Sequence, residues 1–263
     1  MTQEPAAIDT TVAHSPRIWN YWLGGKDNYE VDRMVGDQFR EIFPAIVDIA
    51  RSSRLFLSRA VEHLAGEAGV GQFLDIGTGL PTVDNTHQVA QRVSPSARVV
   101  YVDNDPVVLA HARALLLGSP EGSTTYIDAD LYETDAILDS AAQSLDLDRP
   151  VALVLMNILG HVPDMDLARS VVTRLVDRLP SGSYLVVADG TNVVDGPAFD
   201  AAIEMWNQAG SLPYHLRKPE QIAQFFDGME LLEPGVVSCS RWRAPGTSPA
   251  AEVDEFCAVG RKR

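Results

Sequence analysis

The stretch Phe73-Leu74-Asp75-Ile76-Gly77-Thr78-Gly79-Leu80-Pro81-Thr82 decides the fold of this 263-residue chain. Residues 72–76 have the apolar character of a buried strand, two glycines follow, and Thr82 and Asp84 are both suitable caps for a helix that opens there. Glycine allows a sharp turn and lets the backbone approach a ligand without a Cβ in the way. Such turns lie at the carboxyl ends of parallel strands, where α/β folds bind ligands. A tight strand–helix turn without a ligand is the alternative interpretation.

A second carboxylate follows the next strand. Residues 98–102 form an apolar run, and Asp103-Asn104-Asp105-Pro106 comes directly after it. A carboxylate at the tip of this strand can accept hydrogen bonds from both ribose hydroxyls of an adenosine. We therefore assign Asp103 to the ribose of a ligand, with helix capping as the alternative. Asp105 is interpreted as a helix cap, because Pro106 suits the first turn of a helix.

The third strand, within Tyr126-Ile127-Asp128-Ala129-Asp130-Leu131, also ends in acidic residues. An acid at this point can accept a hydrogen bond from the exocyclic amine of adenine, and a neighbouring backbone N–H can reach a ring nitrogen. We choose Asp130, with Leu131 beside it, over Asp128, whose side chain falls within the strand. Three strand ends that each suit one part of a nucleoside are more specific than any one motif.

From residue 71 onward, short apolar runs alternate with amphipathic segments. Strands are expected at 72–76, 98–102, 124–127, 151–156 and 184–188, and helices at 84–93, 105–117, 134–144 and 165–179. This order predicts an α/β fold with a Rossmann-like, doubly wound and mostly parallel sheet. Two later runs, 230–238 and 253–260, are separated by a turn-rich segment into which no helix fits. They predict an antiparallel pair at the C-terminal edge of the sheet.

The first 66 residues have a different character from the rest of the chain. Residues 1–14 are polar and small, and they predict a disordered leader. Residues 15–66 carry apolar side chains at helical spacing, with a break at Pro44 and an end near Gly66 and Gly69. They predict an N-terminal helical cap that forms one structural unit with a ligand-binding domain of residues 70–263.

Within this cap, the segment from Arg17 to Tyr29 is rich in aromatic residues and contains Gly24-Gly25, a natural hinge or point of close approach. Aromatic side chains provide apolar walls with polar tips, which suit a small-molecule pocket. We expect the segment to close the site as a lid, with Tyr21 as a candidate catalytic residue. The alternative is a helix that is packed permanently on the sheet.

Composition limits the classes of partner. The chain has 21 Lys and Arg against 36 Asp and Glu, a formal net charge of −15. A field of this sign repels phosphate backbones and anionic lipids, so no nucleic acid or membrane partner is expected. Cys239 and Cys257 are too few for a disulfide framework or a four-ligand zinc site, and no compact metal-ligand spacing predicts a metal. Without an apolar span or a signal sequence, the default expectation is a cytoplasmic protein.

These motifs resemble those of the class I S-adenosylmethionine-dependent methyltransferases. The acid-x-Gly-x-Gly pattern matches Asp75-Ile76-Gly77-Thr78-Gly79, and VALVLMNILGHVPD (151–164) is similar to the segment after the fourth strand of that family, with Asn157 and His161 at its active-site end. The resemblance implies S-adenosylmethionine as cofactor and S-adenosylhomocysteine as product. It implies these cofactor-binding residues: Asp75, Gly77, Gly79, Asp103, Asp130, Leu131 and Asn157.

A narrower likeness reaches back to about residue 15. SPRIWNYWLGGKDNYEVDR, DIGTGLPT and RKPEQIAQFFDGMELLEPGVVSCSRWRAPG are similar to an actinobacterial family of S-adenosylmethionine-dependent methyltransferases, long labelled a domain of unknown function. That likeness implies the fold and the cofactor but supplies no substrate. The chain departs from many class I enzymes at Pro81, where they carry a third glycine. Because proline has no N–H, this position has no backbone donor to offer to a ligand.

Two other functions stay open from the sequence. A nicotinamide-dependent oxidoreductase would use a G-x-G-x-x-G/A turn, but Thr82 occupies the third position and Asp75 would repel a pyrophosphate. A regulator that binds S-adenosylmethionine or S-adenosylhomocysteine, or a catalytically degenerate enzyme, would keep the same fold without turnover.

Methyl transfer itself requires chiefly proximity and alignment, because the donor carbon is already activated. An acceptor oxygen can need a general base, and His161, just past the fourth strand, is the best placed of the six histidines. Helix capping is its alternative role. We expect a small-molecule acceptor, while O-, N- and C-methylation and the oligomeric state all remain open.

Overall fold

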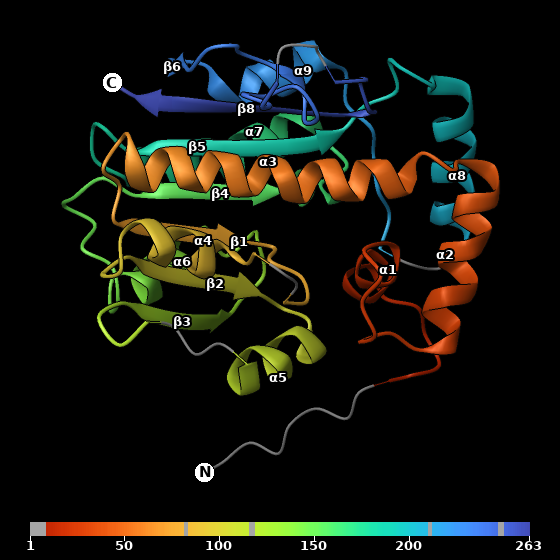
Figure 1. Cartoon of the computed structure of the whole chain (residues 1–263), viewed down its shortest axis with the longest axis horizontal. Helices are drawn as coiled ribbons and strands as arrows, with labels where there is room; N and C mark the ends of the chain where they lie inside the picture. Colours follow the sequence, from red (N-terminus) through yellow and green to blue (C-terminus); the bar gives the residue numbers. More distant parts are fainter. Residues whose placement is uncertain (1–8, 82–83, 116–118, 210–211, 247–249) are drawn as a thin grey trace.

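The chain folds around one mixed sheet (Figure 1). The computed structural model describes residues 9–81, 84–115, 119–209, 212–246 and 250–263. Its strands are β1 (Gln72–Ile76), β2 (Arg98–Asp103), β3 (Ser123–Asp128), β4 (Ala152–Met156), β5 (Tyr184–Gly190), β6 (Met229–Leu231), β7 (Val237–Ser238) and β8 (Glu255–Lys262). Its helices are α1 (Ser15–Trp22), α2 (Glu30–Ile42), α3 (Ile46–Gly66), α4 (Thr86–Val93), α5 (Pro106–Leu115), α6 (Thr134–Ala141), α7 (Met165–Asp177), α8 (Gly196–Gln208) and α9 (Pro219–Ala223), with 3-10 turns η1 (Leu159–His161) and η2 (Gln224–Phe226).

The order of strands across the sheet is β3-β2-β1-β4-β5-β8-β6, with β7 paired to β8. Strands β1 to β5 are mutually parallel, and β1 pairs with β2 on one side and with β4 on the other. The chain therefore winds outward in both directions from β1. This reversal places a crevice at the carboxyl ends of β1 and β4, the usual ligand position in such sheets. The predicted α/β, doubly wound and mostly parallel architecture is confirmed.

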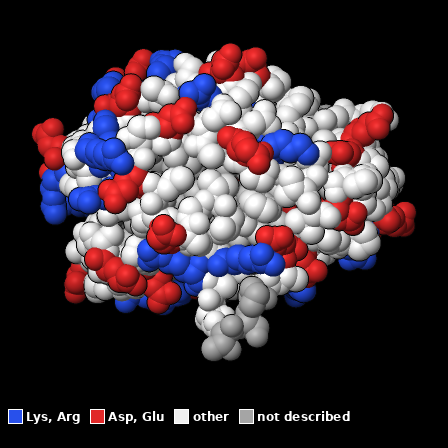
Figure 2. Space-filling model, turned by 90° about the horizontal axis from the view of Figure 1, so that it is seen from above, with Lys and Arg blue, Asp and Glu red and all other residues white. Residues whose placement is uncertain are grey.

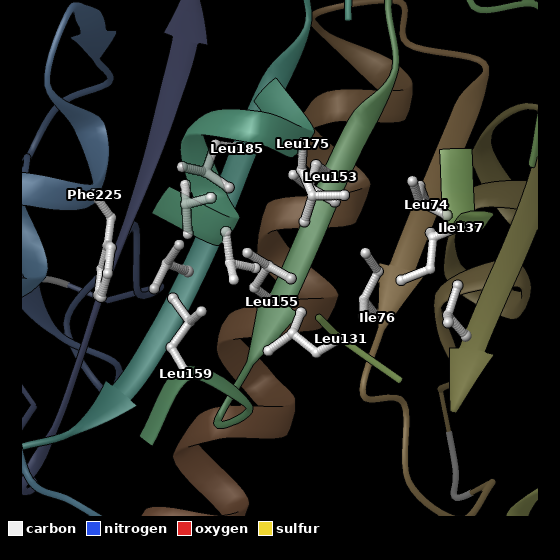
Figure 3. Close-up of a cluster of buried hydrophobic side chains, with 14 of the residues drawn as sticks. Leu74, Ile76, Leu131, Ile137, Leu153, Leu155, Leu159, Leu175, Leu185 and Phe225 are labelled. Carbon is white, nitrogen blue, oxygen red and sulfur yellow. The ribbon is translucent and has the colours of Figure 1, made fainter. Parts of the chain in front are cut away.

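Helices cover both faces of the sheet, because successive strand residues point to opposite sides. Phe73 is fully buried in a cluster that includes side chains of α3 and α4. Leu74, the next residue, is fully buried in a second cluster that includes Ile137 of α6 and Leu175 of α7 (Figure 3). Since both faces are covered, the polar ends of the strands are the part of the sheet that is available to a ligand.

The expected antiparallel pairing at the C-terminal edge of the sheet is confirmed, but its strands have different bounds from those predicted. Strand β8 lies inside the sheet, antiparallel to β5 on one side and to β6 and β7 on the other. The expected single strand at 230–238 is divided into β6 and β7. Pro234 lacks an N–H for the ladder, and Gly235 has a φ of 80°, so the strand cannot continue through them.

The N-terminal cap has a core of its own. Ile18 and Trp22 of α1 are buried with Phe39 of α2 and with Phe199 and Trp206 of α8. The cap lies opposite the carboxyl ends of the parallel strands, and α3 runs from the cap across one face of the sheet (Figure 1). Its first part belongs to the cap core and its second part to the sheet core, so one continuous helix joins the two.

Residues 9–14 lie against the cap. The Arg17 guanidinium, 1% exposed, forms an ion pair with Asp32 at 3.0 Å and donates to the carbonyl of Asp9 at 3.0 Å. The backbone N–H of His14 also donates to Asp32 at 3.0 Å. These contacts fix the path of residues 9–14, whereas the rest of the expected disordered leader, residues 1–8, lies outside the described residues.

The predicted boundaries shift at the helix after the glycine turn. Helix α4 begins at Thr86, and its preceding residue, Asn85, donates its backbone N–H to Oε1 of Gln88 at 2.9 Å. Asp84, one of the two expected caps, instead has a φ of 60° and belongs to the turn. The other expected cap, Thr82, lies outside the described residues. Pro44 separates α2 from α3, and α3 ends at Gly66, both as predicted.

Figure 2 shows the face that lies above the β6–β8 side of the sheet. Lys and Arg are interspersed with Asp and Glu around a broad area of neutral residues on this face. The visible surface is therefore of mixed sign. Among the helices that the structure describes, none combines the length and the apolar character needed to cross a bilayer.

Candidate active site

A cavity of about 560 Å³ opens at the carboxyl ends of β1 to β4, beneath α1. The turns after these strands line one side, α1 and the residues before it line the other, and α3 contributes Ser53, Arg54 and Leu57. A volume of 300–1,000 Å³ is typical of small-molecule sites. The cavity occupies the switch point of the sheet, where the sequence predicted a ligand.

The glycine turn after β1 has the expected conformation. Gly77 and Gly79 take φ values of 74° and 62°, in the left-handed region that favours glycine. A Cβ on Gly77 would lie 2.7 Å from the side chain of Ile158, so this position also lacks space for any other residue. The N–H of Gly79 donates to Oδ2 of Asp103 at 2.9 Å, which ties the turn to the end of the next strand.

Asp103 ends β2 and is 9% exposed at the cavity wall. Its Oδ1 accepts the backbone N–H of Asp105 at 2.9 Å, and burial raises its pKa to about 6. Carboxylate oxygens accept more than one hydrogen bond each, so Asp103 retains capacity for ligand hydroxyls. Asp105 accepts the backbone N–H of Val107 at 2.7 Å and so caps α5, as the sequence predicted.

The end of β3 supplies Asp130 and Leu131 to the cavity wall. Asp130 is half-buried and accepts hydrogen bonds from Asn104 Nδ2 and from the backbone N–H of Tyr132, each at 3.0 Å. Asp128 is exposed and does not line the cavity. The structure therefore places Asp130, and not Asp128, beside Asp103.

Two groups of opposite charge, the buried Asp75 and the half-buried Arg54, line the cavity near the glycine turn. Asp75 is 5% exposed and accepts the Thr86 hydroxyl at 2.6 Å, and burial raises its pKa to about 6. Arg54, on α3, lines the same cavity and donates to the backbone carbonyl of Asp84 at 2.9 Å. Burial lowers the pKa of Arg54, and its attraction to the Asp75 carboxylate opposes that shift. The pair offers one anionic and one cationic group to a ligand.

Asn157 follows β4 with a φ of 56° and lines the cavity. Its Nδ2 donates to Ser53 Oγ at 3.2 Å and to Oε1 of the buried Glu255 at 3.0 Å. Burial raises the pKa of Glu255 to about 7. These contacts hold the amide in one orientation, so Asn157 has a fixed position at the centre of the strand ends.

His161 ends η1 and lines the cavity. Its Nδ1 lies 2.8 Å from the carbonyl oxygen of Pro213, and its ring meets the Tyr214 ring edge-on at 5.1 Å. Burial lowers the pKa of His161. The alternative role for His161 was a cap on the following helix. Asp164 caps that helix instead, and its side chain accepts from the N–H of Leu167 at 2.8 Å.

Comparison with known families shows the class to which the protein belongs. A family model described as S-adenosyl methyltransferase matches residues 1–263. The chain belongs to the S-adenosyl methyltransferase family. S-adenosylmethionine is accordingly the cofactor of this methyltransferase, and the oxidoreductase alternative from the sequence is not supported.

Two solved structures cover nearly the whole methyltransferase chain. A DUF574 family protein from Streptomyces avermitilis MA-4680 is 42% identical, with a TM-score of 0.93 over 98% of this chain and 100% of that one. A candidate methyltransferase from Thermobifida fusca YX is 37% identical, with a TM-score of 0.90 over 100% of both chains. Among curated proteins, none matches the chain significantly. The narrower likeness to an actinobacterial family of unknown function is confirmed.

Tyr21 does not reach the cavity of the methyltransferase. Its hydroxyl donates to Oδ1 of Asp37 at 2.7 Å, and that hydrogen bond raises the pKa of the tyrosine. Residues are spaced by about 100° around an α-helix, so Tyr21 lies on a different side of α1 from Trp19 and Leu23, which both line the cavity. The candidate catalytic role of Tyr21 is therefore not retained.

Sequence reasoning missed Arg54, Tyr214 and Glu255. Each lies far along the chain from the motif that it supports, and none belongs to a local pattern. The available signals were weak: Arg54 is an arginine on the otherwise apolar side of a helix, and Glu255 is a carboxylate at the start of an apolar strand. Groups of three or more His, Cys, Asp or Glu side chains with metal-binding geometry do not occur among the described residues.

Proposed function

We propose that this methyltransferase holds S-adenosylmethionine in the cavity and transfers its methyl group to a small-molecule acceptor that enters the same cavity. The observation that carries the proposal is the convergence of three strand ends. The Gly77–Gly79 turn, Asp103 and Asp130 line one continuous wall, in the order β1, β2, β3. Each supplies a group that suits one part of the cofactor.

The residues present fit each part of the cofactor. Asp103 would accept hydrogen bonds from the ribose hydroxyls, and Asp130 would accept one from the adenine amine, with Leu131 as an apolar wall for the ring. The amino-acid end carries an ammonium and a carboxylate, and Asp75 and Arg54 provide the complementary charges. Gly79 leaves space for close approach, because a Cβ there would meet no atom nearer than 3.9 Å, whereas the corresponding space at Gly77 holds Ile158.

The acceptor is a small molecule because the cavity of about 560 Å³ must hold it together with the cofactor. When bound, S-adenosylmethionine supplies an activated methyl group on a sulfonium sulfur. The protein's part is to align an acceptor atom with that methyl group and to exclude water, and α1 covers the cavity for this purpose.

Calorimetric titration with S-adenosylmethionine tests the proposal. Wild-type protein should bind it, and Asp103→Ala should weaken binding by about tenfold or more, because each hydrogen bond to a charged group contributes roughly 1.5–3 kcal/mol. Asp103→Asn keeps an acceptor oxygen for the turn and serves as the milder variant. Asp128→Ala is the matched control, since Asp128 pairs with Asp103 in the strand register but is exposed outside the cavity. Wild-type affinity in folded Asp103→Ala and Asp103→Asn proteins would exclude the ribose assignment.

A further inference from the structure

The cavity has a second side, away from the carboxylates that the proposed function assigns to the cofactor. The carboxylates Asp75, Asp103 and Asp130 come from β1, β2 and β3, while β4 lies on the opposite side of β1. The residues that line the cavity from β4, η1 and the neighbouring loops are here called the acceptor side: Met156, Asn157, Ile158, His161, Val162 and Leu212. Leu212 adjoins Pro213, whose carbonyl contacts His161.

The acceptor side is mostly apolar and carries no charged side chain. Four of its six residues are aliphatic or thioether side chains, Asn157 is a neutral amide held by Ser53 and Glu255, and His161 is the titratable one. Among the cavity-lining residues that the structure describes, the Asp side chains and Arg54 all belong to the part around β1 to β3 and α3. An acceptor with a negative charge would therefore meet no cation on this side, and an alkylammonium would leave its charge among apolar walls.

The tautomer of His161 is fixed by its surroundings. A carbonyl oxygen only accepts, so Nδ1, 2.8 Å from the Pro213 oxygen, carries the ring proton. Nε2 is then the nitrogen with a free lone pair. Because burial lowers the pKa of this ring, the imidazole is neutral near pH 7 and is able to accept a proton.

The imidazole is also held in place by a built support. Residues 213–217, here called the strap, run beside the turns after β4 and β5. The His215 N–H donates to the Gly160 carbonyl at 2.8 Å, and the Arg217 N–H donates to the Gly190 carbonyl at 2.9 Å. The buried side chain of Arg217, at the end of the strap, forms an ion pair with Asp189 of β5 at 2.9 Å. A base carried on such a support has the fixed geometry that proton transfer requires.

We propose that the acceptor is a neutral molecule with an acidic hydroxyl on an aromatic or enol carbon, and that Nε2 of His161 removes the hydroxyl proton during methyl transfer. This inference rests on the proposed function, since the methyl donor must occupy the other side of the cavity. A neutral, flat molecule suits the apolar walls. Its hydroxyl is acidic enough for an imidazole to assist, whereas an aliphatic alcohol is far less acidic.

The step balances as follows. The O–H proton passes to Nε2, the hydroxyl oxygen forms a new bond to the methyl carbon, and the carbon–sulfur bond breaks with its electron pair left on sulfur. The products are a methyl ether, S-adenosylhomocysteine and a protonated His161, which returns its proton to water. No oxidant, reductant or metal takes part.

A matched set of naphthalene probes tests the class of acceptor: 2-naphthol, 2-naphthalenemethanol, 2-naphthylmethylamine and 2-naphthoate. Phenol is added as a smaller hydroxyl probe. Methylated product is measured by mass spectrometry with S-adenosylmethionine as donor. A phenolic probe should be converted faster than the alcohol, the amine and the carboxylate. Faster conversion of any of those three, or no conversion of either phenolic probe, would overturn the inference.

His161→Asn separates a base from a structural residue, because its amide can still donate to the Pro213 carbonyl. S-adenosylmethionine affinity by calorimetry should stay within about twofold, since the donor side is untouched. Conversion of 2-naphthol should fall about 100- to 10,000-fold at pH 7 and recover in part toward pH 10, where the phenol ionises without a base. Unchanged conversion, or a loss that pH does not rescue, would contradict the role of Nε2. Failure of donor binding in the wild-type protein would instead contradict the proposed function.

Discussion

The ring of Tyr214 occupies the space where a side chain on Gly160 would stand: a Cβ there would lie 2.2 Å from Cζ of the ring. Tyr214 donates its hydroxyl to Asp189 and accepts the N–H of Gly190 at 3.1 Å. The strap and the turn that carries His161 therefore fit together only because position 160 lacks a side chain.

Gly160→Ala should lower the free energy of unfolding by about 1–3 kcal/mol, because either the strap or the turn must shift to admit the methyl group. Urea unfolding of the variant and the wild-type protein measures this loss. Gly71→Ala is the control, since a Cβ there meets nothing within 4 Å. Equal stability of the Gly160→Ala and Gly71→Ala proteins would show that the strap moves away at no cost.

The turn after β1 permits a test that separates crowding from backbone strain. Gly77→Ala meets Ile158 at 2.7 Å and also holds a φ of 74°, which costs a residue with a side chain about 1–2 kcal/mol. In the double variant Gly77→Ala/Ile158→Ala the crowding is removed and the strain remains. Urea unfolding should then show a coupling between the two changes of about 0.5–3 kcal/mol in the favourable direction. Simple additivity would mean that Ile158 does not restrict position 77.

Asp75 should reduce stability at neutral pH while it contributes to binding. Its pKa rises from an ordinary 3.8 to about 6 through burial, so between pH 4 and pH 6 the folded chain binds more protons than the unfolded chain. The free energy of unfolding therefore falls as the pH rises through this window, by up to about 3 kcal/mol for this group.

Asp75→Asn keeps an oxygen for the Thr86 hydroxyl but removes the charge. At pH 7 the variant should be more stable than the wild-type protein by about 1–3 kcal/mol, and the two should converge toward pH 4. Calorimetry should show weaker binding of S-adenosylmethionine and unchanged binding of adenosine. A stability gain that is equal at pH 4 and pH 7 would rule out a titration effect, and Asp128→Asn provides an exposed control.

The sequence predicted the parts of the site that belong to local strand–turn–helix patterns. Gly77, Gly79 and Asp103 follow directly from their strands, because a parallel sheet brings consecutive strand ends to one edge. The structure brings them together at one cavity wall, as the sequence predicted. The antiparallel C-terminal pairing was also recognised, but the insertion of β8 between β5 and β6 is a long-range choice that no local pattern encodes.

Residues that reach the site from distant segments were not predictable in this way. Arg54 lies on α3, Tyr214 on the strap and Glu255 at the start of β8, and only the packing of the whole chain brings them to the strand ends. Tyr21 shows the converse error. The aromatic composition of the segment around Tyr21 suited a pocket, but the position of Tyr21 on α1 directs its hydroxyl to Asp37.

Arg54 should contribute to donor binding through its charge. Arg54→Gln should weaken S-adenosylmethionine binding by roughly tenfold to a hundredfold and leave adenosine binding unchanged, because only the former has a carboxylate to pair with the guanidinium. Arg51→Gln is a close control, since Arg51 lies one turn earlier on α3 with a side chain that is 68% exposed. Equal losses for both nucleosides would indicate that Arg54 supports the turn without contacting the amino-acid end.

Trp19 should report the arrival of the cofactor. It lines the cavity, whereas Trp22 is 6% exposed within the cap core and does not line it, although the two rings meet edge-on at 5.6 Å. Addition of S-adenosylmethionine should change the fluorescence of the wild-type protein and of Trp22→Phe, and the change should be lost in Trp19→Phe. Calorimetry on the same samples confirms that donor is bound in all three.

If α1 closes over the bound donor as a lid, the response of Trp19 should also follow a second, slower phase in stopped-flow mixing, because closure comes after encounter. A single phase whose rate rises linearly with donor concentration would indicate a cap that stays in place, consistent with the burial of Ile18 and Trp22 in its core.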